Sequence, residues 1–227
     1  MNLNILYEDN DILVCEKPAG IATQSSRLGT PDMVSLLKNH LRRQSPQQQP
    51  YLAVIHRLDQ PVTGLLVFAK TKRAAADLNK QLTTSGFGKH YLALLTGIPS
   101  PDEADLTNYL IKDNKTNTSR ISTQNTPGSK EARLHYKLIQ KGSHSSLAEI
   151  TLDTGRHHQI RVQMAHLGCP IQGDVKYGAS APGQLQLYAC RLTFRHPVHH
   201  QTLEFTLDAS RLPVIHESDN VGTIPTA

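Results

Sequence analysis

Residues 54–70 read VIHRLDQPVTGLLVFAK, and this stretch decides the expected fold because it predicts a strand, a charged loop and a second strand. Turn-forming residues interrupt the apolar run at Gln60, Pro61 and Gly64. The segment from Leu65 to Ala69 is then continuously apolar, which is typical of a strand buried on both faces. The loop carries three side chains of possible reactivity, His56, Arg57 and Asp59. Rigid strands on both sides would hold these side chains at fixed positions, as a reactive site requires.

A purely structural interpretation of the same loop is that Arg57 and Asp59 pair to close a turn. Charged loop residues are usually structural or solvated, so this stretch alone does not separate the two interpretations. The rest of the chain has to do so.

Composition and charge restrict the class of protein. The chain has 227 residues, enough for one large domain or two small lobes with a buried core. No window is apolar enough to span a membrane, and the N-terminal residues lack the pattern of a signal peptide. The three cysteines are far apart and odd in number, so a reducing cytoplasm is the expected compartment. A net charge of +5 favours a polyanionic partner.

Periodicity predicts more strands than helices. Strands are expected at residues 5–7, 12–16, 91–95, 134–139, 147–152, 185–194 and 203–207. Helical spacing predicts three helices, one over 33–41 capped by Thr30 with Pro31 at its first position, one from Thr71 to Leu82, and one over 159–167. We expect the polar residues from Pro99 to Ser129 to be loop or a hairpin excursion, apart from one short strand near 109–111.

Several of the expected strands are neighbours in the chain and look connected as hairpins. The predicted fold class is therefore α+β, with a mixed, mainly antiparallel central sheet flanked by helices. We expect residues 1–216 to form one domain and residues 217–227 to be a flexible tail.

A second informative stretch, LDTGRHHQIRV, covers residues 152–162. It predicts a strand end, a tight turn at Gly155 and a helix that begins with Arg, His and Gln side chains. Helix N-terminal amides together with arginines make a natural anion site. The candidate binding residues here are Arg156, His158 and Gln159.

Other chemistries find less support. The pairs His157–His158 and His199–His200 lack the ligand spacing of a metal site, so no metal is expected. There is no GxSxG elbow for a serine hydrolase and no glycine-rich phosphate loop for a nucleotide cofactor, so no cofactor is expected.

Taken in order, four segments resemble the RluA-type RNA pseudouridine synthases. They are ILYEDNDILVCEKPAG at 5–20, HRLD at 56–59 with GLL and AKT at 64–66 and 69–71, TGR and HQIRV at 154–156 and 158–162, and GD and YG at 173–174 and 177–178. Three residues, in two of these segments, depart from the family pattern. Val62 and Thr63 stand for its usual Thr-Ser, and His157 stands for its usual Thr.

The resemblance implies the pseudouridine synthase fold, with residues 1–216 as its catalytic domain and no separate N-terminal RNA-binding module expected. It also implies a role for each candidate residue. Asp59 would be the catalytic carboxylate, Arg161 its partner, and Tyr91 the ring that stacks on the target uracil. Arg57 would help to displace the target base and occupy its place in the RNA. The other candidate substrate-binding residues are His56, Arg156, His158 and Gln159. The implied partner is tRNA or rRNA, with no membrane and no obligate protein partner.

These roles agree with the physics of the reaction. A buried catalytic carboxylate stays ionised when a permanent cation lies beside it, and arginine serves this purpose better than lysine. The target base must leave its stack at a cost of a few kcal/mol, and stacking on an aromatic ring recovers about 1–3 kcal/mol.

Two alternatives stay open. One is a protein that binds or folds RNA on the same scaffold without catalysis, which turnover of an unmodified transcript would exclude. The other is a hydrolase that uses Asp59 with His56 or His158, which release of free uracil or cleaved RNA would favour.

Overall fold

The computed structural model describes residues 3–25, 29–47, 49–84, 86–213 and 215. The chain divides into two compact units, and we call Met1–Lys89 with Tyr188–Arg211 unit 1 and His90–Leu187 with Leu212–Ala227 unit 2. The expected flexible tail at 217–227 lies outside the described residues. The helices in the described part of the chain are too short or too polar to cross a lipid bilayer.

The sheet of unit 1 is mixed. Its strands lie in the order β1 (Asn4–Glu8), β2 (Ile12–Lys17), β4 (Thr63–Ala69) and β10 (Leu187–Arg195). In addition, β3 (Ala53–Val54) pairs with β4, and β11 (Thr202–Thr206) pairs with β10. All these pairs are antiparallel except β4 with β10, which run parallel. The apolar runs of β2 and β4 are buried almost throughout, so these strands form the centre of the unit's core.

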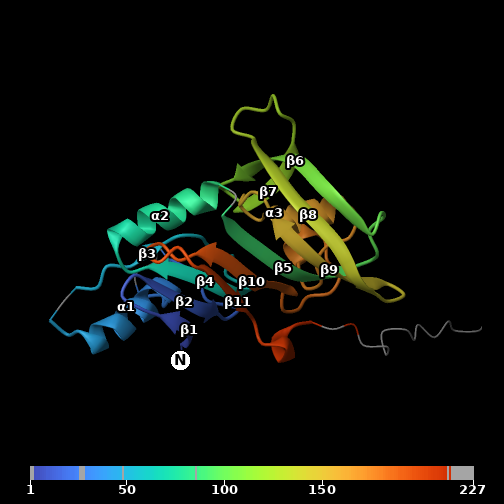
Figure 1. Ribbon diagram of the computed structural model, residues 1–227. Coiled ribbons are helices and arrows are strands. Elements are labelled where there is room, and N and C mark those ends of the chain that lie inside the picture. The colour runs from blue at the N-terminus through green and yellow to red at the C-terminus, as the bar shows by residue number, and fades with distance from the viewer. Residues whose placement is uncertain (1–2, 26–28, 48, 85, 214, 216–227) are drawn as a thin grey trace, which may run out of the picture. The chain divides into compact units, whose positions relative to one another are not determined.

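Two helices belong to unit 1, α1 (Met33–Gln44) and α2 (Lys72–Thr83), and Figure 1 shows α2 alongside β3 and β4. The predicted start of α2 is confirmed, because the Thr71 hydroxyl accepts a hydrogen bond from Ala74 N. The predicted cap of α1 is wrong. Asp32 is the N-cap, since its carboxylate accepts from Ser35 N at 2.7 Å in a capping box.

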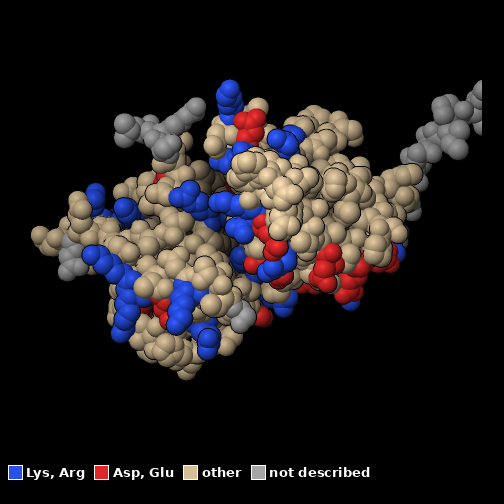
Figure 2. Space-filling view, turned by 90° about the horizontal axis from the view of Figure 1, so that it is seen from above, with Lys and Arg blue, Asp and Glu red and all other residues tan. Residues whose placement is uncertain are grey.

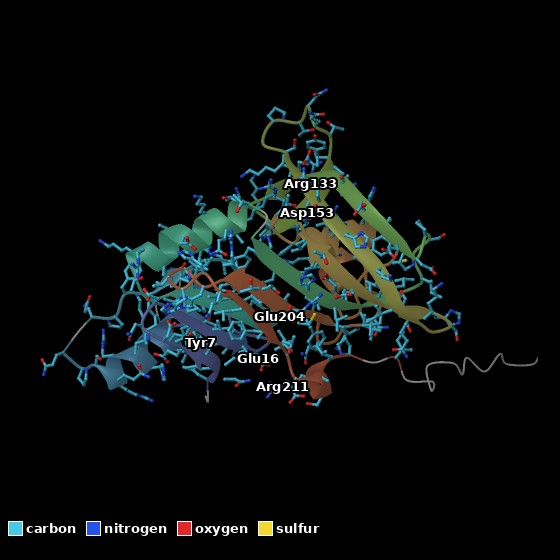
Figure 3. All side chains as sticks on the ribbon, viewed as in Figure 1. Tyr7, Glu16, Arg133, Asp153, Glu204 and Arg211 are labelled. Carbon is cyan, nitrogen blue, oxygen red and sulfur yellow. The ribbon has the colours of Figure 1, made fainter. Side chains whose placement is uncertain are left out.

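An ion pair joins the C-terminal segment of unit 1, Tyr188–Arg211, to the centre of the unit. Arg211, in the short 3-10 helix η2 (Ala209–Arg211), donates to the buried carboxylate of Glu16 on β2 at 2.6 Å (Figure 3). Glu16 also accepts from the Asn4 side chain on β1, at 2.8 Å. The buried carboxylate is therefore paired rather than left without partners.

Unit 2 is an antiparallel sheet with one helix. Its strands follow in the order β5 (Phe87–Thr96, which starts in unit 1), β9 (Ser145–Leu152), β8 (Lys130–Lys141), β6 (Glu103–Asp113) and β7 (Thr118–Ser122). The helix α3 (Gln159–His166) contacts β6 and β7, and the 3-10 helix η1 (Val175–Tyr177) follows it. Near the end of the β8–β9 pair, Arg133 and Asp153 lie 3.8 Å apart (Figure 3).

The polar segment from Pro99 to Ser129 was expected to be loop or a hairpin excursion, with one short strand near 109–111. The structure has the hairpin, formed by β6 and β7, and its first strand extends well beyond 109–111. The residues of β6 alternate between half-buried and exposed, so one face of the strand is solvated and carries polar side chains. Pairing with β8 stabilises the strand where its own composition does not.

The predicted α+β class, with a mixed and mainly antiparallel sheet flanked by helices, is confirmed. Eight residues of α3 lie where the helix over 159–167 was expected. The predicted strand, loop and strand around Asp59 correspond to β3, residues 55–62 and β4.

Candidate active site

The loop over residues 55–62 is held on the N-terminal side of Asp59. Thr23 and Leu58, both buried, form a reciprocal pair of hydrogen bonds. The Thr23 hydroxyl donates to Leu58 O at 3.0 Å and accepts from Leu58 N at 3.1 Å. The backbone that leads into Asp59 is therefore fixed by a side chain 35 residues earlier in the chain.

The loop is held equally on the C-terminal side of Asp59. Gln60 O accepts from Gly20 N at 2.9 Å and from the Lys17 ammonium at 3.0 Å, and the Gln60 side chain donates to Gly20 O at 2.9 Å. Asp59 O accepts from Val62 N at 3.0 Å, which closes the turn into β4. Asp59, itself half-buried, thus sits between two anchored neighbours.

Lys17 is the centre of this anchor. Its side chain is fully buried, and the ammonium also donates to Pro18 O and Ile21 O, at 2.9 and 2.8 Å. Burial lowers the pKa of Lys17 to about 8, and the negative charge of Asp59 acts in the opposite direction. One buried cation therefore joins the segment that ends β2 to the loop that carries Asp59.

His56 makes its contacts inside unit 1. Its Nε2 accepts from Val67 N on β4 at 3.3 Å, and its ring packs edge-on against Phe87 at 5.4 Å. Burial and, next, the charge of Lys89 lower the pKa of His56 to about 3, so the ring is neutral at physiological pH. Nε2 is an acceptor here, which assigns the ring proton to Nδ1, a buried atom without a partner in the described structure.

Arg57 is exposed on the same loop and donates to the Gln24 side chain at 3.0 Å. An exposed guanidinium beside an anchored carboxylate can reach a large polyanion without rearrangement of the core. That Arg57 and His56 bind substrate remains a prediction.

In unit 2, the loop before α3 is organised by Gln159, which is 2% exposed. Its Oε1 accepts from the Thr154 hydroxyl and from Arg156 N, at 2.8 and 2.9 Å, and its Nε2 donates to Arg133 O at 2.9 Å. The amide is thus engaged within its own unit. A contact between Gln159 and substrate remains a prediction.

Arg156 and His158 differ in exposure. Arg156 is exposed, with its Nε donating to Glu131 O at 2.6 Å. His158 is buried and adopts a left-handed backbone conformation at the start of α3, with φ of 54°. Burial, followed by the charge of Arg161, lowers the pKa of His158 to about 3, so this ring is also neutral at physiological pH.

Arg161, on α3, is buried and forms a two-pronged ion pair with Asp174. Its Nε and Nη2 each donate to one carboxylate oxygen at 2.7 Å. The Tyr177 ring faces the guanidinium at 5.0 Å from its centre. Tyr91, on β5, is 7% exposed and opposite Ile150 of β9.

The predicted catalytic residues belong to different units, Asp59 to unit 1 and Tyr91 and Arg161 to unit 2. The pairing of Asp59 with Arg161 and the stacking of Tyr91 on a uracil therefore remain predictions. Four further residues have structural roles that the sequence did not predict, namely Lys17, Thr23, Asp174 and Tyr177. Asp174 and Tyr177 lie in the GD and YG motifs, and Lys17 precedes a proline after an apolar strand, but no local pattern marks Thr23.

Most of the residues described above fall within a match to a known protein family. The family model described as RNA pseudouridylate synthase matches residues 11–166, which include the Asp59 loop and all of α3. The chain belongs to this family. The expected likeness to RluA-type synthases is confirmed.

Individual relatives agree with the family assignment. The chain is 36% identical over 221 residues to ribosomal large subunit pseudouridine synthase D of Nitrosomonas europaea, covering 95% of this chain and 61% of that protein. It is 32% identical over 213 residues to the dual-specificity RNA pseudouridine synthase RluA of Salmonella typhi, covering 91% and 93%. The chain spans less than two thirds of the length of several curated relatives that it matches.

A solved structure extends the likeness to the pseudouridine synthase fold. Human RNA pseudouridylate synthase domain containing 4 matches with a TM-score of 0.76 at 22% identity, covering 92% of this chain and 88% of that one. At this identity the match concerns the fold alone, and it agrees with the fold expected from the sequence.

Proposed function

We propose that the chain isomerises specific uridines in RNA to pseudouridine, with Asp59 as the catalytic carboxylate. The observation that carries the proposal is the anchoring of the Asp59 loop on both sides, by Thr23 before it and by Lys17 and Gly20 after it. A carboxylate that must meet one carbon atom of a flipped nucleotide needs such a rigid support. Membership in the RNA pseudouridylate synthase family supplies the reaction.

In the proposed reaction, Asp59 acts at the target uridine and the glycosidic bond breaks. The uracil rotates, and a carbon–carbon bond to the ribose replaces the carbon–nitrogen bond, so the product is an isomer of the substrate. Arg57 fills the space that the base leaves in the RNA, Tyr91 stacks on the uracil, and Arg161 pairs with Asp59. The reaction uses neither metal nor cofactor.

We assign the substrate to RNA of the large ribosomal subunit, with tRNA as the second candidate. Several relatives are named for the large subunit, among them the Nitrosomonas protein. The net charge of +5 favours a polyanion, and Figure 2 shows Lys and Arg side chains gathered in several patches on one face. Phosphate contacts, Arg156 among them, position the strand. We propose that the protein acts in the cytoplasm, on RNA and without attachment to a membrane.

The test is a transcriptome-wide map of pseudouridine in which a chemical adduct stops reverse transcription. A strain lacking this protein is compared with strains restored by wild type, by Asp59→Asn, or by the control Asp102→Asn. Asp102 is a matched control because its carboxylate is 60% exposed and pairs with Lys141 in unit 2. Sites lost on deletion should return with wild type and with the control, but not with Asp59→Asn.

Each other outcome has a definite meaning. Sites that return with Asp59→Asn reject Asp59 as the catalytic group. If no RNA loses a site although the protein is well expressed and binds RNA, the non-catalytic RNA-binding protein replaces the enzyme as the interpretation. Free uracil or cleaved RNA from the purified protein would instead identify a hydrolase.

A further inference from the structure

The carboxylate of Asp174, in unit 2, forms a two-pronged ion pair with Arg161. The two side chains are 1% and 7% exposed, and two hydrogen bonds of 2.7 Å join them. The bonds use Nε and Nη2, so one edge of the planar guanidinium is committed to Asp174. A guanidinium has five N–H donors in a fixed fork, and a two-pronged carboxylate therefore sets both its position and its plane.

Tyr177 restrains the same guanidinium from a second direction. Its ring lies 5.0 Å from the Arg161 guanidinium carbon, and its backbone N donates to Asp174 O at 3.0 Å. The one-turn helix η1 thus places the carboxylate and the ring on one short segment. The ion pair and the ring contact on Arg161 therefore both come from residues 174–177.

The Tyr177 hydroxyl is itself anchored by two other segments. It accepts from Ser119 N on β7 at 2.8 Å and lies 2.7 Å from His158 Nδ1. Burial and nearby cations keep His158 neutral, and its Nδ1 shares a hydrogen bond with the tyrosine hydroxyl. The position of the Tyr177 ring is therefore fixed by its contact with Arg161 and by the two hydrogen bonds of its hydroxyl.

We infer that Asp174 is a positioning residue for the isomerase reaction, because it holds the Arg161 guanidinium in the orientation in which Arg161 pairs with the catalytic carboxylate. Tyr177 supports the same orientation. This inference rests on the proposed function. A buried arginine without its carboxylate partner would adopt other rotamers or draw in water, and its donors would no longer point in one direction.

The kinetic test compares Asp174→Asn with wild type on an RNA fragment that contains the target uridine. We expect kcat to fall about 100-fold, as misplacement of a catalytic partner by about 1 Å does, with KM within about threefold of wild type. Tyr177→Phe is the matched control. It keeps the ring over Arg161 but loses the bonds of the hydroxyl, and we expect a loss below about tenfold in kcat.

A double-mutant cycle separates positioning from general damage to the fold. In an Arg161→Lys background there is no planar fork to orient, so Asp174→Asn should change kcat less than about threefold further. An additive loss in the double variant overturns the inference. So does a kcat for Asp174→Asn within threefold of wild type in a folded protein.

Two further measurements cover the remaining outcomes. If Asp174→Asn fails to fold, Asp174→Glu keeps the charge but adds a methylene that displaces the guanidinium, and an unchanged kcat in that variant overturns the inference. If wild type makes no pseudouridine, the proposed function has failed, and NMR then tests the orientation of Arg161 without activity. The Arg161 Nε–H signal, assigned by its absence in Arg161→Lys, should be slow to exchange in wild type and lost in Asp174→Asn. A signal that persists refutes the role of Asp174.

Discussion

Replacement of Lys17 by Met tests whether the buried ammonium supports the Asp59 loop. The methionine fills most of the same space, so the change removes the charge and its donors while preserving the packing of the side chain. Three carbonyl groups lose a donor, those of Pro18, Ile21 and Gln60. Gln60 O keeps its hydrogen bond from Gly20 N, so the cost falls on the other two acceptors, Pro18 O and Ile21 O.

The expected loss of stability follows from this count. An acceptor left without its partner costs about 1–3 kcal/mol, which gives about 2–6 kcal/mol for two. Removal of a buried charge returns part of this, so we expect the free energy of unfolding to fall by about 3 kcal/mol. For a protein of this size, the melting temperature should drop by about 6–12 °C.

Urea unfolding of Lys17→Met and wild type measures the difference, with Lys72→Met as the control. Lys72 is exposed in the first turn of α2 and loses the same charge, so its substitution should change stability by less than about 0.5 kcal/mol. A loss below about 1 kcal/mol for Lys17→Met at an unchanged denaturant slope would refute the reasoning.

Two other predictions concern the strands around the same loop. Gly64→Ala should destabilise unit 1 by about 3 kcal/mol, because Gly64 has a φ of 148° and an added Cβ would lie 2.5–2.6 Å from the backbone and Cβ of Ala189. Calorimetry measures this, and a melting temperature equal to that of wild type contradicts it. His56 has a folded pKa of about 3 against about 6.5 when unfolded, so the unfolded state binds the extra proton and stability falls as the pH drops from about 6.5 toward 3. His56→Gln should make the slope between pH 4 and 6 shallower by about 1.4 kcal/mol per pH unit, and parallel slopes would refute this.

Local patterns predicted the elements whose stability is local. The continuous apolar run of β4 and the cap at Thr71 both depend on neighbours in the sequence, and the structure confirms both. The polar strand β6 depends instead on its pairing with β8, which a reading of its own residues does not include. The cap of α1 was misplaced because Thr30-Pro31 and Asp32 compete as start signals, and only the position of Ser35 decides between them.

For the candidate site, the sequence identified residues whose chemistry is visible in a motif, and it omitted those that act by holding others. Thr23 and Leu58 are 35 residues apart, and Arg161 and Asp174 are 13 apart, so their pairing follows from the fold rather than from spacing. The charge of Lys17 is visible in the sequence, but its complete burial is not. A motif therefore predicts the residues proposed to act on the substrate, but not the residues that hold them in position.

The parallel pairing of β4 with β10 has a consequence for how the chain is made. Gly64 meets Ala189 in that pair, and the whole of His90–Leu187 is synthesised between them. At a ribosomal rate of about 5–20 residues per second, β4 waits on the order of ten seconds for this neighbour. During that time its hydrogen-bonding edge beside the Asp59 loop can be occupied by a chaperone or by another nascent chain. A fragment that stops before β10 would keep this edge exposed permanently, so the N-terminal segment that carries the Asp59 loop should aggregate when it is expressed alone.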